Sequence, residues 1–156
     1  MAETRYRGMQ PGDEGPAGEL VGRVFEAQVA PWFSAEGVAE FLRYVEPEAW
    51  RQRLEARPPA FVAEQGEELV GVIEGRGPGH ISLLFVAGDE QRQGLGRELV
   101  RLIVEEFRRR FPGLGSVEVH ASPNAVGAYE QFGFGTRAPE QVVDGIRFIP
   151  MEMPLP

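Results

Sequence analysis

A short glycine-bearing segment, Gln91-Arg92-Gln93-Gly94-Leu95-Gly96, has the residue types of an anion-binding loop. It follows an apolar run from Ile81 to Val86 and leads directly into a sequence with helical periodicity. The first N–H groups of a helix lack acceptors within the helix, and the helix dipole favours negative charge beside them. Glycine also lets a ligand approach the main chain closely, because it has no Cβ. The segment therefore predicts a site for a phosphate or pyrophosphate group.

Two common phosphate loops do not fit this segment. A Walker-type loop needs a lysine after its glycines, and the chain contains no lysine. The dinucleotide fingerprint G-x-G-x-x-G needs a third glycine at the position of Leu99. A nucleoside-triphosphate hydrolase, a kinase of the Walker type and a dinucleotide-binding enzyme are all disfavoured.

The residues on either side predict the elements that position this loop. Behind it, an apolar stripe at helical spacing opposes a charged face; its members are Leu95, Leu99, Leu102, Ile103 and Phe107. Ahead of it, the pattern changes from helical to strand-like after Pro58-Pro59. We expect, in order, a strand at 4–10, helices near 18–29, 34–45 and 47–54, a hairpin at 61–74, a strand at 80–86, the long helix, a strand at 116–120, a short helix and a closing hairpin turning at Asp144-Gly145.

Composition limits the class of protein. A chain of 156 residues without repeats or long linkers predicts one domain over 1–156. A net charge of −8 disfavours nucleic acid as a partner, since phosphate neutralisation needs a basic surface. The absence of cysteine excludes disulfides and thiolate metal sites, and we expect no metal. No apolar run is long enough to span a membrane and the first residues lack the core of a signal peptide, so a cytoplasmic location is expected.

The chain resembles the GNAT superfamily of acetyl-CoA-dependent N-acetyltransferases. Residues 91–96 match the family's pyrophosphate pattern Q/R-x-x-G-x-G/A, and residues 122–134 resemble its second signature, a short helix carrying a tyrosine before Gly-Phe. The start and the closing hairpin are also similar, so the resemblance covers nearly the whole chain. It implies an α/β mixed fold of the α+β type. A mostly antiparallel, twisted sheet of six to seven strands would be flanked by about four helices, and the fourth and fifth strands would splay apart.

The resemblance also implies where acetyl-CoA, as cosubstrate, would bind. The fourth strand would bond the pantetheine arm through its backbone, as an added strand does. The loop and the first helical turn would take the pyrophosphate. Where many members have an asparagine for the pantetheine, this chain has Ser122, with Asn124 two residues later, and either could substitute. The implied cofactor-binding residues are Leu84, Phe85, Val86, Gln91, Arg92, Gln93, Gly94, Leu95, Gly96, Arg97, Ser122 and Asn124.

Three residues are candidates for proton transfer. Tyr129 matches the family tyrosine that protonates the leaving thiolate, and a phenol with a pKa near ~10 stays protonated at neutral pH; a packed core aromatic is the alternative. His80, at the start of the fourth strand, is the first candidate for the base that takes the amine proton, and a strand-end histidine that only hydrogen-bonds is the alternative. Glu118 is the second, with His120 on the same strand face and Glu74 a weaker choice.

We therefore expect direct transfer of an acetyl group from acetyl-CoA to an amine acceptor, either a small molecule or a protein amine. The acidic composition favours a cationic acceptor. A catalytically silent acyl-CoA-binding module is the alternative function. The closing hairpin is compatible with a homodimer, and the sequence does not name the acceptor because acceptor loops vary freely on one scaffold.

Overall fold

The computed structural model describes residues 3–88 and 94–156. Its elements follow the order β1 (Thr4–Gly8), α1 (Glu14–Gln28), η1 (Ala30–Trp32), α2 (Ala35–Tyr44), α3 (Pro47–Glu55), β2 (Ala60–Gln65), β3 (Glu68–Arg76), β4 (His80–Val86), α4 (Leu95–Arg110), β5 (Ser116–Ala121), η3 (Pro123–Ala125), α5 (Val126–Phe132), β6 (Gly135–Thr136), β7 (Gln141–Val143) and β8 (Ile146–Pro154). The expected order of elements and mixed α/β class are confirmed.

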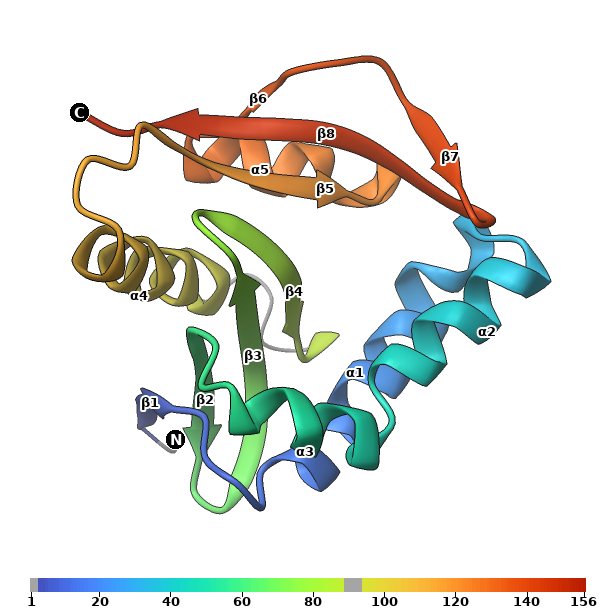
Figure 1. Ribbon diagram of the computed structural model, residues 1–156. Helices are drawn as coiled ribbons and strands as arrows, with labels where there is room; N and C mark the ends of the chain where they lie inside the picture. Colours follow the sequence, from blue (N-terminus) through green and yellow to red (C-terminus); the bar gives the residue numbers. More distant parts are fainter. Residues whose placement is uncertain (1–2, 89–93) are drawn as a thin grey trace.

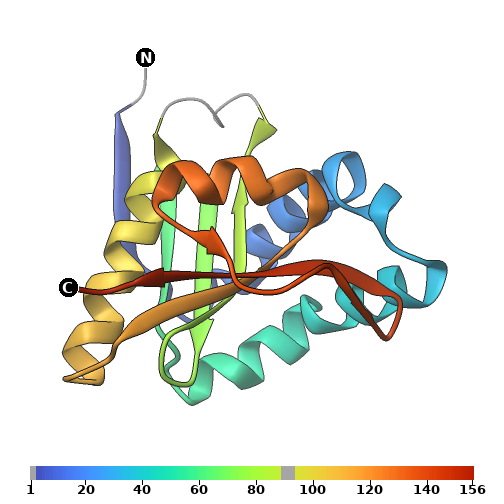
Figure 2. The same cartoon turned by 90° about the horizontal axis from the view of Figure 1, so that it is seen from above.

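The strands form one sheet in two halves (Figures 1 and 2). Its order is β1-β2-β3-β4-β5-β8-β6, with β7 paired to β8 off this path. Every pairing is antiparallel except that of β4 with β5. This parallel pair is registered at only two positions, His80 with Glu118 and Ile81 with Val119. Beyond Ile81 the strands separate, which confirms the expected splayed pair.

The described residues contain eight strands and five α-helices, where six to seven strands and about four helices were expected. The additional strand is β6, which pairs with β8, whereas β7 is the first arm of the expected closing hairpin. Strand β6 has two residues, both exposed, so it lacks the alternation of buried and exposed residues that marks a strand in the sequence.

Helices cover both faces of the first half of the sheet, because its strands alternate their side chains between two cores. On one face α4 packs on β2 and β3, burying Leu99, Ile103 and Phe107. On the other, α1 and α3 pack over a second core that includes Leu20 and Trp50. The ends of β3 and β4 that carry the candidate site are therefore held from two sides.

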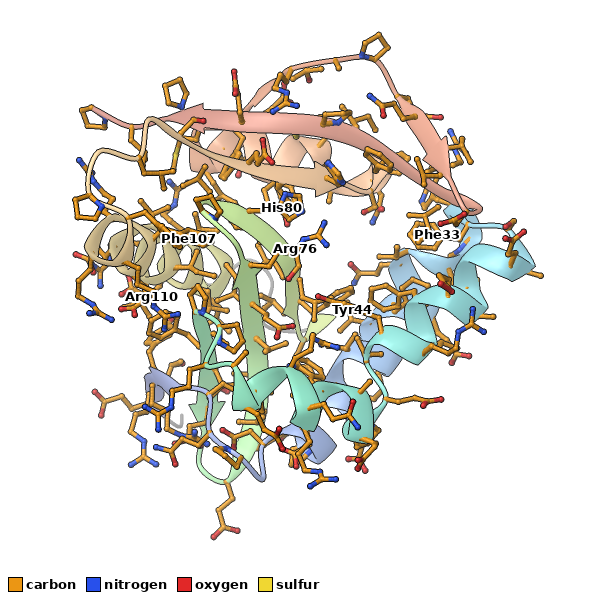
Figure 3. The ribbon with its side chains drawn as sticks, viewed as in Figure 1. Phe33, Tyr44, Arg76, His80, Phe107 and Arg110 are labelled. Atoms are coloured by element: carbon orange, nitrogen blue, oxygen red, sulfur yellow. The ribbon has the colours of Figure 1, made fainter. Side chains whose placement is uncertain are left out.

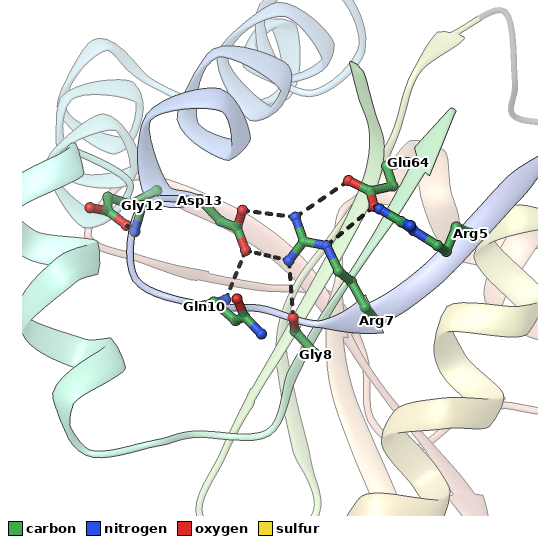
Figure 4. Close-up of polar contacts among 8 residues, drawn as sticks. Arg5, Arg7, Gly8, Gln10, Gly12, Asp13 and Glu64 are labelled. Atoms are coloured by element: carbon green, nitrogen blue, oxygen red, sulfur yellow. Dashed lines mark hydrogen bonds and ion pairs between the residues drawn. The ribbon is translucent and has the colours of Figure 1, made fainter. Parts of the chain in front are cut away.

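The first strand is fixed to its neighbours by arginines. The Arg7 guanidinium donates two hydrogen bonds to Asp13 at the entry to α1, at 2.8 and 3.0 Å, and pairs with Glu64 on β2 at 3.3 Å (Figure 4). Arg5 also pairs with Glu64. Asp13 in turn accepts from the backbone N–H of Gln10 at 2.8 Å. These contacts tie the β1–α1 turn to the sheet.

Candidate active site

A cleft of about 1050 Å³ opens where β4 leaves β5. Residues from both halves of the molecule line it, including β4, the start of α4, the start of α5, α2 and the β7–β8 hairpin. The ribbon shows β5 and β8 crossing over the first half of the sheet on one side of this opening (Figure 1). The cleft therefore exists because a sheet that is continuous at its base divides above Ile81.

The edge of β4 forms one wall. Leu84, Phe85 and Val86 all line the cleft. On their other side these residues are in register with β3, from Ile73 to Gly71. Because pairing with β5 ends at Ile81, this stretch of β4 has a strand neighbour on one side only. An extended ligand can complete the sheet there, as the family resemblance implies for pantetheine.

The start of α4 is built from glycines. Gly94 has φ of +80° at the N-cap, a left-handed conformation that a side chain strains, and open space surrounds its missing Cβ. Gly96 lines the cleft, and a Cβ there would come within 3.1 Å of the Phe132 ring. Gly96 therefore also allows α5 to pack against α4.

Two further residues that were predicted to hold the pyrophosphate, Leu95 and Arg97, lie within the described part of the chain. Leu95 is buried in the core, so only its backbone can serve a ligand. Arg97 is exposed, with its guanidinium 5.8 Å from the centre of the Phe132 ring. Gln91, Arg92 and Gln93 lie outside the described residues.

Tyr129 lies on α5 and lines the cleft from an apolar setting. Tyr129 is 7% exposed. The rings of Phe132 and Phe134 lie edge-on to its ring, with 5.9 and 5.5 Å between ring centres. Burial raises the pKa of Tyr129 above its ordinary value, because the phenolate would lose its hydration. No hydrogen bond joins its hydroxyl to any residue that the structure describes. Tyr129 thus remains a neutral donor available to a ligand.

His80 lies at the base of the cleft in a polar setting. Its Nδ1 is 3.4 Å from Oε1 of Glu118, its register partner on β5. Its Nε2 is 3.5 Å from the Arg76 guanidinium. Burial, then the charge of Arg76 and the ring of His120, lower the pKa of His80 despite the opposing effect of Glu118. With Nδ1–H donating to the carboxylate, the neutral ring presents Nε2 as an acceptor.

Glu118 lies behind His80 and does not line the cleft. Its other oxygen, Oε2, accepts a hydrogen bond from Arg137 at 2.6 Å. Burial opposes ionisation of Glu118, but the hydrogen bonds with His80 and Arg137 outweigh it, and the net pKa is lowered. The structure therefore joins His80 and Glu118, the two candidate bases, in one hydrogen-bonded pair.

The remaining candidates differ in their access to the cleft. His120 lines it, edge-on to His80 at 4.8 Å and stacked on Phe148 at 4.2 Å between ring centres. Ser122 and Asn124 also line it, and the serine hydroxyl donates to the Asn124 side-chain oxygen at 2.8 Å. Glu74 is buried outside the cleft lining and bonds to Arg53 at 3.0 Å. Its position makes direct contact with an acceptor unfavourable.

An aromatic wall faces the His80 end. Phe33, Phe41 and Tyr44 line the cleft from η1–α2 and α2, and Phe41 lies 5.7 Å from Phe85 on β4. In Figure 3, Phe33, Tyr44, Arg76 and His80 lie around the opening between the two halves. The sequence did not mark Arg76, Arg137, Phe41 or Tyr44 as site residues. Arg137 and Phe41 contact residues that are distant in the chain, and Arg76 meets His80 only because the β3–β4 turn sets the two residues opposite each other, so no local pattern marks these contacts.

The β7–β8 hairpin closes this end. The Gly145 carbonyl accepts a hydrogen bond from the Ser34 N–H at 3.1 Å, next to the start of α2. A Cβ at Gly37 would overlap that carbonyl, so α2 can carry the hairpin only with glycine there. Asp144 and Gly145 both have positive φ, as the hairpin signal in the sequence predicted.

No helix within 3–88 or 94–156 is long and apolar enough to cross a membrane. Among the same residues, no cluster of three or more histidine and carboxylate side chains could hold a metal ion.

The sequence matches the family model described as Acetyltransferase (GNAT) domain over residues 29–155. No curated protein matches it significantly. Solved structures share the fold across almost the whole chain. A GCN5-related N-acetyltransferase from Rhodopseudomonas palustris is 21% identical, with a TM-score of 0.83. The match covers 99% of this chain and 98% of that protein's chain.

Two further structures are similar. The PaiA N-acetyltransferase from Thermoplasma acidophilum, in complex with coenzyme A, is 18% identical with a TM-score of 0.78, covering 98% of this chain and 99% of its own. A ribosomal-protein-alanine N-acetyltransferase from Brucella melitensis is 23% identical with a TM-score of 0.73, covering 97% of this chain and 99% of its own.

Proposed function

Because the chain belongs to the GNAT family of acetyltransferases, we propose that it transfers the acetyl group of acetyl-CoA directly to an amine in a ternary complex. The observation that carries the proposal is the parting of β4 and β5 after His80 and Ile81, beside the glycine-bearing start of α4. This opening gives one ligand both an unpaired strand edge and a helix N-terminus, and Tyr129 and His80 both line it.

The residues at the opening fit acetyl-CoA as cosubstrate. The β4 edge at Leu84–Val86 would bond the pantetheine amides. The first-turn N–H groups between Gly94 and Arg97 would face the pyrophosphate, where the helix dipole favours negative charge. Ser122 and Asn124 line the cleft on the opposite side and would supply polar contacts to the pantetheine.

His80 would act as the base. The amine nitrogen attacks the thioester carbon, and His80 Nε2 takes the proton that this nitrogen loses. Glu118 would orient the ring through Nδ1 and stabilise the imidazolium that forms, while Arg137 holds Glu118 in place. Glu118 is then a positioning residue, since it lies behind His80.

Tyr129 would act as the acid. As the carbon–sulfur bond breaks, its hydroxyl protonates the thiolate, and backbone N–H groups near Leu84 or Phe85 would stabilise the developing oxyanion. A silent acyl-CoA-binding module would need neither a proton donor nor an acceptor in the cleft. Tyr129 and His80 in the same lining therefore favour an enzyme.

The test separates binding from turnover and uses two substitutions at one strained position. Gly94→Ala and Gly94→Glu share the cost of a side chain at positive φ, but only glutamate adds negative charge at the helix start. Acetyl-CoA at about 100 times its Kd should raise the melting temperature of the wild type by roughly 5–10 °C. We expect Gly94→Ala to keep most of this shift and Gly94→Glu to lose it.

Turnover is followed in the same samples as thiol release with a panel of amines. An equal shift in the two Gly94 variants would contradict the pyrophosphate site. A normal shift in the wild type without thiol release or acetylated amine would instead identify a silent binding module.

A further inference from the structure

The cleft lining carries positive charge although the chain is strongly acidic. Among the described residues that line it, three arginines, Arg43, Arg76 and Arg147, accompany two carboxylates, Glu40 and Asp144. The whole chain has a net charge of −8. Local charge therefore opposes the cationic acceptor that composition alone favoured.

Two of these arginines already have carboxylate partners. Arg43 pairs with Glu40 one turn away on α2. Arg147 makes two hydrogen bonds to Glu140, at 3.0 and 3.1 Å, and lies over the Trp32 ring. Arg76 has no carboxylate partner in the part of the chain that the structure describes; its side-chain contact is with His80. Arg76 is thus the cleft guanidinium with capacity for an anion.

The position of Arg76 relates that anion to the reacting amine. Arg76 and His80 are register partners across the β3–β4 turn, and Arg76 Nη2 lies 3.5 Å from His80 Nε2. An acceptor held by both would need its amine and its anionic group close together. An α-amino acid meets this need, since one carbon carries both groups.

Besides the charge of its lining and the position of Arg76, the cleft has a third relevant feature, which is an apolar wall. The wall formed by Phe33, Phe41, Tyr44 and Phe85 borders the same opening, and Phe33 and Tyr44 lie around it with Arg76 and His80 (Figure 3). Large apolar side chains fill such a surface better than a methyl group does.

We propose that the acceptor is a free α-amino acid with a large apolar side chain, whose carboxylate binds Arg76 while its amine faces His80 Nε2. This proposal rests on the proposed function and specifies its acceptor. A guanidinium binds a carboxylate with two parallel hydrogen bonds, which gives orientation as well as affinity. The free carboxylate distinguishes this acceptor from a protein N-terminus, which presents an amide at the same place.

The test uses acceptors that differ in one group. L-Phenylalanine, L-phenylalaninamide and phenethylamine share a ring, but only the first has a carboxylate, and L-alanine keeps the carboxylate without the ring. Values of kcat/KM are compared per concentration of unprotonated amine, because the amide has the lower amine pKa. We expect phenylalanine to exceed its amide, and to exceed alanine, by about tenfold or more in each case.

Arg76→Gln should abolish the preference for phenylalanine over its amide. The matched control is Arg51→Gln, since Arg51 is an exposed arginine on α3 that pairs with Glu48 and does not line the cleft. It should leave the preference intact. A preference for the amide in the wild type, or one for phenylalanine that survives in Arg76→Gln, would overturn the proposal.

The acceptor site can also be tested without turnover. The binding of phenylalanine and of its amide is then measured by calorimetry, with acetyl-CoA or free CoA present. If no amine is acetylated, the proposed function fails. Binding of phenylalanine that Arg76→Gln removes would still support this site, and absence of such binding would overturn it.

Discussion

The surroundings of Tyr129 and His80 differ in how each controls a proton. Tyr129 is held among Phe132 and Phe134, and burial alone raises its pKa. His80 is held among Glu118, Arg76 and His120, where burial and two neighbours lower its pKa against one carboxylate. Burial acts on both, but it favours the neutral form, which carries a proton in tyrosine and lacks one on Nε2 of histidine.

This difference assigns opposite roles to two groups in one cleft. A phenol whose ionisation is suppressed can give a proton, and an imidazole kept neutral can take one. The Tyr129 side depends on apolar packing, so it should respond to loss of its hydroxyl and little to nearby charges. The His80 side depends on charged neighbours, so substitutions at those neighbours should shift its pH dependence in predictable directions.

The largest expected effect is on the apolar side. Tyr129→Phe keeps the ring and its contacts with Phe132 and Phe134 and removes only the hydroxyl. We expect kcat to fall about 10²-fold or more, with the acetyl-CoA melting shift nearly unchanged. A kcat within about threefold of the wild type would show that Tyr129 is a packing residue and that its hydroxyl does not act as the acid.

A smaller effect is expected at Glu118. Glu118→Gln removes the charge that supports the His80 imidazolium, so the His80 pKa should fall and His80 should become a weaker base. We expect kcat/KM to fall about three- to tenfold and its acid limb to move to lower pH. The control is Glu152→Gln, since Glu152 faces Glu118 from β8 in the strand register. Equal losses in both variants would show a general effect on the sheet.

With an acceptor that has no carboxylate, the smallest effect is expected at Arg76, where the acid limb of kcat/KM should move in the opposite direction. The Arg76 charge lowers the His80 pKa, so Arg76→Gln should raise it and move the acid limb to higher pH, by less than about one unit. Phenethylamine is the acceptor for this measurement, because it has no carboxylate to report on Arg76 as a binding residue. A limb that moves to lower pH would contradict the electrostatic role given to Arg76.

Local sequence patterns predicted much of the fold. Strand β4 has the predicted bounds, and Asp144-Gly145 turns the closing hairpin. Helix α1 begins at Glu14, several residues before the predicted start near Gly18. Two glycines and Pro16 weaken the helical pattern there, although proline is tolerated in a first helical turn.

The site was predicted less completely, for a physical reason. Spacing and resemblance predicted Tyr129, His80 and Glu118 as site residues; Tyr129 and His80 line the cleft, and Glu118 is paired with His80. Arg76 and Arg137 were not found. Arg137 reaches Glu118 from the loop after β6, and Arg76 reaches the cleft because the β3–β4 turn sets it opposite His80. Such contacts depend on strand register and tertiary packing, which local periodicity does not encode.

The central claim is that His80 takes the amine proton, and the pH dependence of kcat/KM tests it most directly. With the best acceptor of the panel, whose amine pKa lies well above the range, log kcat/KM should rise with a slope of about one near pH 7, since only the free amine reacts. Below the His80 pKa, which lies under its usual value of about 6.5, the slope should steepen to about two. His80→Ala should react more slowly and keep a slope of about one throughout. The same break at an unreduced rate in His80→Ala would contradict the account.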